Sequence, residues 1–166
     1  MLSDPGDVGF VYFLSDKPVE SMSDLRKSKV WMWTDDRLVR AMYKKLGING
    51  VPLGVPDVLP ALQTGRIDAC YSSPLAAVAL QWYTKVDHVT SMPMSYSIGG
   101  GVVRKEVFDK ASAKDQKMIL KIEKIVRRKL RQVVRKDNRR AFKAMKSSGV
   151  EVVDTPSKMK KRFRKA

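Results

Sequence analysis

Short apolar segments recur along the chain, and stretches with helical spacing separate them. The apolar segments are rich in β-branched and aromatic residues, which is typical of buried strands. They lie at residues 8–14, 29–33, 51–53, 67–70, 97–104 and 151–153. Because strand and helix alternate along the chain, the pattern predicts an α/β fold with a largely parallel sheet.

The helical stretches carry start and stop signals. Thr34 or Asp35 is expected to cap a helix that ends at Gly47. Asp57 is expected to cap a short helix that Gly65 closes. The inward face predicted for the first of these helices consists of Leu38, Met42 and Leu46.

A further helix is predicted where Pro74 follows two serines. Proline is well tolerated at the first helical position, so Ser72 or Ser73 is expected to be the cap. The apolar spacing continues this helix to about Tyr83. Backbone N–H groups at such a helix start favour an anion or a polar oxygen.

The longest predicted helix begins at Ser112 and ends at Gly149. Asp115 stands three residues after Ser112, as in a capping box. Apolar residues follow at helical spacing and predict one stripe, formed by Met118, Ile119, Ile122, Val126, Leu130, Val133, Val134, Ala141, Phe142 and Met145. We expect an α/β ligand-binding lobe at residues 1–105. Residues 106–166 are expected to add the long helix, a short strand and a basic terminal helix that pack on or bridge the lobe.

The charge of the chain is strongly positive, +16 with an isoelectric point near 10.1, and the excess lies mainly after residue 104. Nucleic acid, an anionic membrane surface or a small anionic solute would each suit it. Nucleic-acid surfaces usually combine such charge with a motif or with stacking aromatics. The long helix carries one aromatic residue, Phe142, on its apolar stripe. We interpret its basic face as solvated, with a nucleic-acid-binding module as the alternative.

Residues for catalysis or metal binding are few. The single cysteine, Cys70, cannot form an intramolecular disulfide, and with the single histidine, His88, it is too little for a His/Cys metal site. No nucleophile–base pair, phosphate loop or run of about 18 apolar residues stands out. We therefore predict a protein that is not an enzyme, with no cofactor, metal or catalytic residues. The first residues lack a secretory signal pattern, so an exported protein would carry its signal outside this chain.

Residues 57–69 are similar to the signature of short helix, glycine, strand and aspartate in solute-binding proteins of TRAP-type (tripartite ATP-independent periplasmic) transporters. Other family features follow in the same order over residues 8–156, and the ordered set is specific. They are Ser23–Leu25 with the strand to Trp33, Leu46–Gly47 with Val51–Pro52, Ser73–Ala77, Asp115–Gln116 and Gly149–Val152.

The resemblance implies a periplasmic protein with two α/β lobes that close on a solute, and full members are about twice as long as this chain. We therefore expect a partial periplasmic-binding-protein-like clamshell, mainly one lobe, with a long basic helix. It would capture a small organic, anionic solute for delivery to membrane permease subunits. The alternative within the family is a truncated relative that binds no solute, and pairing of two chains stays open.

The resemblance also implies solute contacts. Trp31 stands where the family has an arginine that clamps a carboxylate, and Trp33 lies on the same side of that strand. Ser73 stands near the family's asparagine, with an uncertainty of one position because of an extra residue. The predicted solute contacts are Trp31, Trp33, Asp57, Tyr71, Ser72, Ser73 and Tyr96. Core packing for the tryptophans and helix capping for the serines and Asp57 are the structural alternatives.

Overall fold

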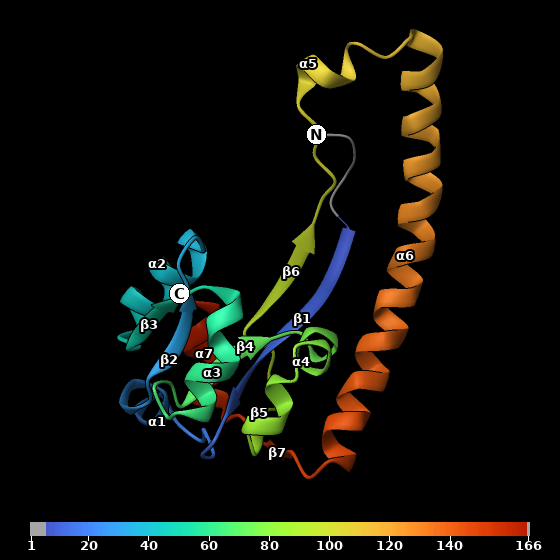
Figure 1. Ribbon diagram of the computed structural model, residues 1–166. Coiled ribbons are helices and arrows are strands. Elements are labelled where there is room, and N and C mark those ends of the chain that lie inside the picture. Colours follow the sequence, from blue (N-terminus) through green and yellow to red (C-terminus); the bar gives the residue numbers. More distant parts are fainter. Residues whose placement is uncertain (1–5, 166) are drawn as a thin grey trace.

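One mixed sheet organises the chain, in a computed structural model that describes residues 6–165. Within this range its strands follow the order β3-β2-β4-β1-β5-β7, and β6 pairs with β1 as well. The strands are β1 (Gly6–Ser15), β2 (Val30–Trp33), β3 (Gly50–Leu53), β4 (Ala69–Ser72), β5 (His88–Thr90), β6 (Ser95–Gly99) and β7 (Glu151–Val153). Figure 1 shows β1 crossing the molecule diagonally as the longest strand.

The direction of β1 differs from that of its neighbours. It is antiparallel to β4, β5 and β6, whereas the pairs β2–β3, β2–β4 and β5–β7 are parallel. Three of the six strand pairs among the described residues are thus antiparallel, so the prediction of a largely parallel sheet is wrong around β1 and correct only for the pairs on either side of it. The C-terminal half of β1 pairs with β4 from Tyr12↔Ser72 to Ser15↔Ala69, and its N-terminal half pairs with β6.

Helices cover the sheet and join its strands (Figure 1). They are α1 (Met22–Lys27), α2 (Arg37–Leu46), α3 (Val58–Gln63), α4 (Pro74–Ala79), α5 (Lys105–Phe108), α6 (Ala113–Ser147) and α7 (Ser157–Arg164), with the 3-10 turns η1 (Val55–Asp57) and η2 (Trp82–Lys85). The α/β fold class predicted from the sequence is confirmed. The division at residue 105 stays a prediction, and β7 from the second segment pairs with β5 from the first. No helix among the described residues is long and apolar enough to span a membrane.

The start of α2 lies later than predicted. Asp36 is the cap, because its carboxylate accepts the N–H of Val39 at 2.9 Å. The buried face of the helix consists of Val39, Tyr43 and Leu46. The predicted inward residue Leu38 is 84% exposed, so that part of the prediction is wrong. Gly47 ends the helix with φ of 69°, as expected.

Three other boundaries also differ from the prediction. β4 is displaced to Ala69–Ser72, and α4 ends at Ala79 because Gln81 takes a left-handed conformation with φ of 59°. β6 ends at Gly99, so the predicted strand over 97–104 is wrong beyond that point. Consecutive glycines have no side chains with which to stabilise a pleated strand, which explains the early end.

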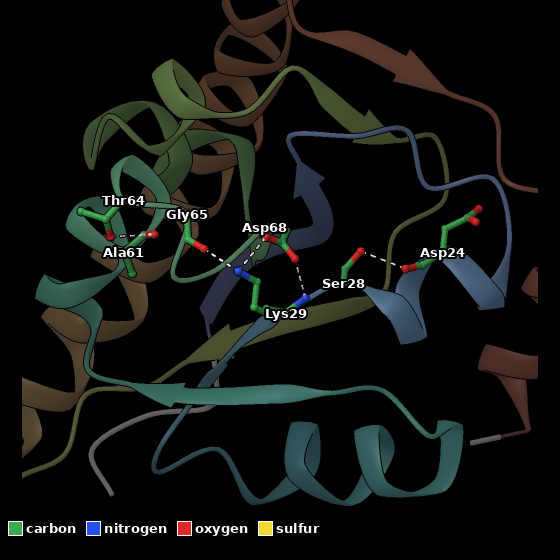
Figure 2. Close-up of polar contacts among 7 residues, drawn as sticks. All are labelled: Asp24, Ser28, Lys29, Ala61, Thr64, Gly65 and Asp68. Carbon is green, nitrogen blue, oxygen red and sulfur yellow. Dashed lines mark hydrogen bonds and ion pairs between the residues drawn. The ribbon is translucent and has the colours of Figure 1, made fainter.

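A polar joint around Asp68 ties the start of β2 to the start of β4 (Figure 2). The Asp68 carboxylate accepts the backbone N–H of Lys29 at 2.8 Å, and the Lys29 ammonium lies 3.3 Å from the same carboxylate. The ammonium also donates to the carbonyl oxygen of Gly65. The backbone N–H of Asp68 returns a bond to the Lys29 carbonyl at 2.9 Å. Asp68 thus sets the register of the two strands that carry most of the predicted solute contacts.

The long helix α6 begins at Ser112, as predicted, with its side chain bonded to the Asp115 backbone N–H. Only its C-terminal part packs against the body, where Ala141 and Met145 are buried. The earlier members of the predicted apolar stripe are largely exposed, for example Ile122 at 52%. Figure 1 shows this part of α6 extending beyond the upper ends of β1 and β6, towards α5.

Candidate functional site

The carboxyl ends of β2 and β4 meet where the topology favours ligand binding, and we call the space outside these ends the strand-end crevice. The two strands are adjacent. The chain leaves β2 through α2 to reach β3 on one side, and leaves β4 through α4 to reach β5 on the other. Such a reversal is a topological switch point, where open α/β sheets bind ligands. Trp33 and Ser72 are the last residues of the two strands and define this crevice.

Trp31 lies beneath the crevice, in the core. It is 4% exposed and stacks on Tyr71 with ring centroids 4.7 Å apart. The ring of Trp82 meets that of Trp31 edge-on, with centroids 5.1 Å apart. The indole N–H of Trp31 donates to the carbonyl oxygen of Leu53 at 3.0 Å. These contacts satisfy the polar atom of the indole and hold its ring rigidly. The structural alternative for Trp31 therefore has direct support, and its contact with a solute stays a prediction.

Tyr71 connects this buried cluster to the rim. Its hydroxyl oxygen accepts the backbone N–H of Trp33 at 3.2 Å. Burial raises the pKa of Tyr71 well above its ordinary value, against the opposing effect of that N–H donor, so the phenol is neutral near pH 7. The Trp33 side chain is 43% exposed. Of the two predicted tryptophans, Trp33 is the one that the described structure leaves accessible.

The start of α4 offers fewer free donors than the sequence suggested. Ser73 is the cap, and its hydroxyl accepts the N–H of Ala76. Pro74 has no N–H, and the N–H of Leu75 donates to the side-chain oxygen of Asn138 at 3.1 Å. The expectation that free backbone N–H groups here favour an anion is therefore wrong. Capping by Ser73 is confirmed, while solute contact by Ser72 or Ser73 stays a prediction.

Asp57 and Tyr96 lie on other elements than Trp31 and Tyr71. Asp57 follows β3, is exposed, and makes no capping hydrogen bond, so its predicted capping role is wrong. Tyr96 lies on β6, opposite Phe10 of β1, and is 42% exposed. The structure therefore gathers Trp31, Trp33, Tyr71 and Ser72 at neighbouring strand ends, whereas Tyr96 belongs to another surface.

That other surface is a cavity of about 900 Å³ between β1, β6, α4 and α6. Four aromatic side chains line it, from Phe10, Tyr12, Tyr96 and Phe142. Three cations from α6 also line it, from Arg135, Arg139 and Lys143. Side chains of cross-strand partners lie on one face of a sheet, so Ser72, the partner of Tyr12, faces the same side as this cavity.

One acidic residue lies among these cations. The Asp7 carboxylate is 2.6 Å from the Arg135 guanidinium and 3.9 Å from that of Arg131. Burial alone would raise the pKa of Asp7. Hydrogen bonds from Arg135 and Tyr96 and the charges of both arginines outweigh that effect, so the pKa of Asp7 is lowered.

The family profile of bacterial extracellular solute-binding protein, family 7, matches residues 1–166. The chain belongs to this family. A solute-binding protein of Verminephrobacter eiseniae is 28% identical over 146 residues, which are 87% of this chain and 43% of that relative. Solute binding, rather than catalysis, is the activity that these names describe.

Solved structures of family members have the same fold. A TRAP periplasmic solute-binding protein of Citrobacter koseri, in an apo, open form, aligns with a TM-score of 0.82 and 26% identity over 97% of this chain and 54% of its own. The protein of Polaromonas sp. JS666, bound to D-erythronate, aligns with a TM-score of 0.86 and 23% identity over 99% of this chain and 53% of its own. The chain thus spans about half the length of the relatives it matches.

The sequence analysis did not predict the cavity between β1, β6, α4 and α6. The cations of α6 were interpreted as a solvated face, because their spacing alone does not say which of them meet other elements. Asn138 was missed as well, although an asparagine within a run of basic residues was a usable signal. Its side-chain amide donates to the carbonyl of Val8 at 2.9 Å, and its oxygen accepts from Leu75, so it joins α6 to β1 and α4.

Proposed function

We propose that this chain is a solute-binding part of a TRAP transporter, which captures a small organic acid in the periplasm and passes it to a membrane permease. It performs no chemistry itself. The observation that carries the proposal is the match of the family profile to residues 1–166, on a fold that aligns with TRAP solute-binding proteins over nearly the whole chain.

Organic acids are the proposed solutes because family structures contain them. D-erythronate is bound in the Polaromonas protein, D-glucuronate in a Citrobacter koseri protein and orotic acid in one from Desulfovibrio salexigens. Each ligand is a carboxylic acid, whereas the sugar and pyrimidine parts differ. The net charge of +16 favours an anion in this chain too.

The crevice between the ends of β2 and β4 is the proposed solute-facing edge. Trp33 offers an accessible aromatic surface there, while Ser72 and Ser73 are 8% and 4% exposed and the Ser73 hydroxyl caps α4. Trp31 and Tyr71 support this edge from below through their stacked rings. Asp57, which follows β3, lies at the same edge of the sheet and adds a polar group.

Calorimetric titration of the purified chain with acids and their neutral analogues tests this function. D-erythronate would be compared with erythritol, D-glucuronate with glucose, and orotate with uracil. Binding of at least one acid, with its neutral analogue more than tenfold weaker, is the expected result. A chain that melts cooperatively but binds none of the acids would contradict the proposal and favour the non-binding relative.

The variant Trp33→Ala, titrated in the same way, tests whether the solute contacts the strand-end crevice. We expect this variant to weaken binding of the acid severalfold, because an exposed aromatic wall is lost. Leu38→Ala is the matched control, since Leu38 is a large apolar residue exposed on the neighbouring α2. Equal affinities of both variants would remove Trp33 from the site.

A further inference from the structure

The cavity between β1, β6, α4 and α6, which we call the α6 cavity, joins aromatic walls to a row of cations. Phe10 and Tyr96 meet edge-on with centroids 4.9 Å apart, and Tyr12 and Phe142 meet at 5.5 Å. The first pair links β1 to β6, and the second links β1 to α6. Its volume, about 900 Å³, lies in the range of small-molecule sites.

Arg135, Arg139 and Lys143 stand four residues apart and therefore share one face of α6. Like charges at this spacing repel each other. The Asp7 carboxylate balances the charge of Arg135, whose guanidinium lies 2.6 Å away. Among residues 6–165 no ion pair is recorded for Arg139 or Lys143. Two positive charges thus line the cavity without an acidic partner.

The residues named at the strand ends offer few donors to an anion. The first N–H groups of α4 are bonded to Ser73 and Asn138. Trp33, Tyr71 and Ser72 bring no positive charge. A carboxylate leaves water at a large cost unless charged or well-placed donors replace its hydration. The α6 cavity supplies those donors, and the crevice residues named here do not.

We propose that the α6 cavity is the anion subsite for the solute, in which Arg139 and Lys143 bind its carboxylate and the aromatic walls hold its less polar part. This assignment rests on the proposed function for the class of ligand, an organic acid. Ser72 faces the same side of the sheet as the cavity, and Pro74 at the start of α4 lines it. The solute therefore extends from the α6 cavity towards the start of α4.

The test is the double variant Arg139→Ala/Lys143→Ala, titrated with D-erythronate, D-glucuronate and orotate. Its control is Arg128→Ala/Lys136→Ala, which removes the same net charge from exposed positions of α6 outside the cavity. Charge-assisted hydrogen bonds are the stronger kind in proteins. We expect the cavity variant to lose affinity for the acid at least tenfold, and the control to lose less than threefold.

A second variant guards against a general loss of structure. Arg139→Lys/Lys143→Arg keeps both charges, and we expect it to retain affinity within about fivefold. If the parent chain binds an acid and the Ala cavity variant binds it as well as the control does, the cavity assignment is wrong and the proposed function stands. If the parent chain binds none of the acids, both proposals are wrong.

Discussion

Two regions of this molecule use the same kinds of apolar side chain in opposite ways. Around the C-terminal half of β1, residues such as Phe13, Val30 and Cys70 are at most 1% exposed. Around the N-terminal half of β1, β6 and the early turns of α6, residues such as Phe10 and Ile122 are about half exposed. Periodicity in the sequence therefore identifies an apolar face, but it does not tell what covers that face.

The largest expected contrast lies within one strand. Phe13→Ala in β1 removes a ring that packs against Tyr43 and Phe163, so we expect a loss of about 3–5 kcal/mol in the free energy of unfolding. Phe10→Ala removes the same ring from a position 52% exposed, and a loss below about 1.5 kcal/mol is expected. Urea denaturation of both variants measures this contrast, and equal losses would show that the open region is as well packed as the core.

The same contrast is expected along α6. Met145→Ala removes a side chain that is 1% exposed, and should cost about 2–4 kcal/mol. Met118→Ala changes a residue that is 50% exposed, and should cost about 0.5 kcal/mol or less. Thermal melts of the two variants provide the comparison. A similar fall in melting temperature for both would mean that the early turns of α6 are covered in solution.

Two aspartates provide a smaller contrast between a bonded and a solvated carboxylate. Asp68→Ala breaks the joint between β2 and β4 and leaves the Lys29 N–H without its 2.8 Å partner, which should cost about 1–3 kcal/mol. Asp57→Ala removes an exposed carboxylate with no capping bond, and little change is expected. Chemical denaturation at neutral pH tests both. A larger loss for Asp57→Ala would contradict the roles assigned to them.

The sequence predicted where the helices and strands lie better than it predicted which elements pack against each other. The strand pattern located β1, β2, β3 and β7, and capping signals located the starts of α4 and α6, because these features depend on neighbouring residues. The inward face of α2 was misassigned because Leu38 stands beside Val39 and Met42 beside Tyr43, so that helical spacing alone fits two neighbouring faces. The cavity escaped prediction because it joins Asp7 and Tyr96 to α6 across more than a hundred and about forty residues, respectively.

The predicted solute contacts also divide into residues placed by local sequence signals and residues whose surroundings depend on distant parts of the chain. Trp33 and the two serines follow from strand ends and a helix cap, and the structure places them at one edge. The burial of Trp31 depends on Tyr71 and Trp82, whose approach no local pattern encodes. The proposed binding of a carboxylate by Arg139 and Lys143 depends on β1 lying opposite them across the cavity, and this arrangement exists only once the sheet is assembled.

The smallest expected effect concerns pH in the open region. The pKa of Asp7 is lowered from its ordinary value near 3.8, so its contribution to stability is present above that value and is lost as the pH falls through the lower folded-state pKa. The parent chain and Asp7→Asn should therefore differ in denaturation midpoint at pH 6, and the difference should shrink as the pH falls below 3.8. Midpoints that differ equally at both pH values would contradict the ion pair with Arg135.

Hydrogen exchange of the chain with and without a bound organic acid tests whether the solute binds in the α6 cavity and at the strand ends. We expect the acid to slow backbone exchange in β1, at the start of α4 and in α6 around residues 135–143, and to leave α2 unchanged. These segments border the cavity and the strand-end crevice. Slower exchange confined to the exposed early turns of α6, or an acid that binds without slowing exchange in β1 and α6, would contradict it.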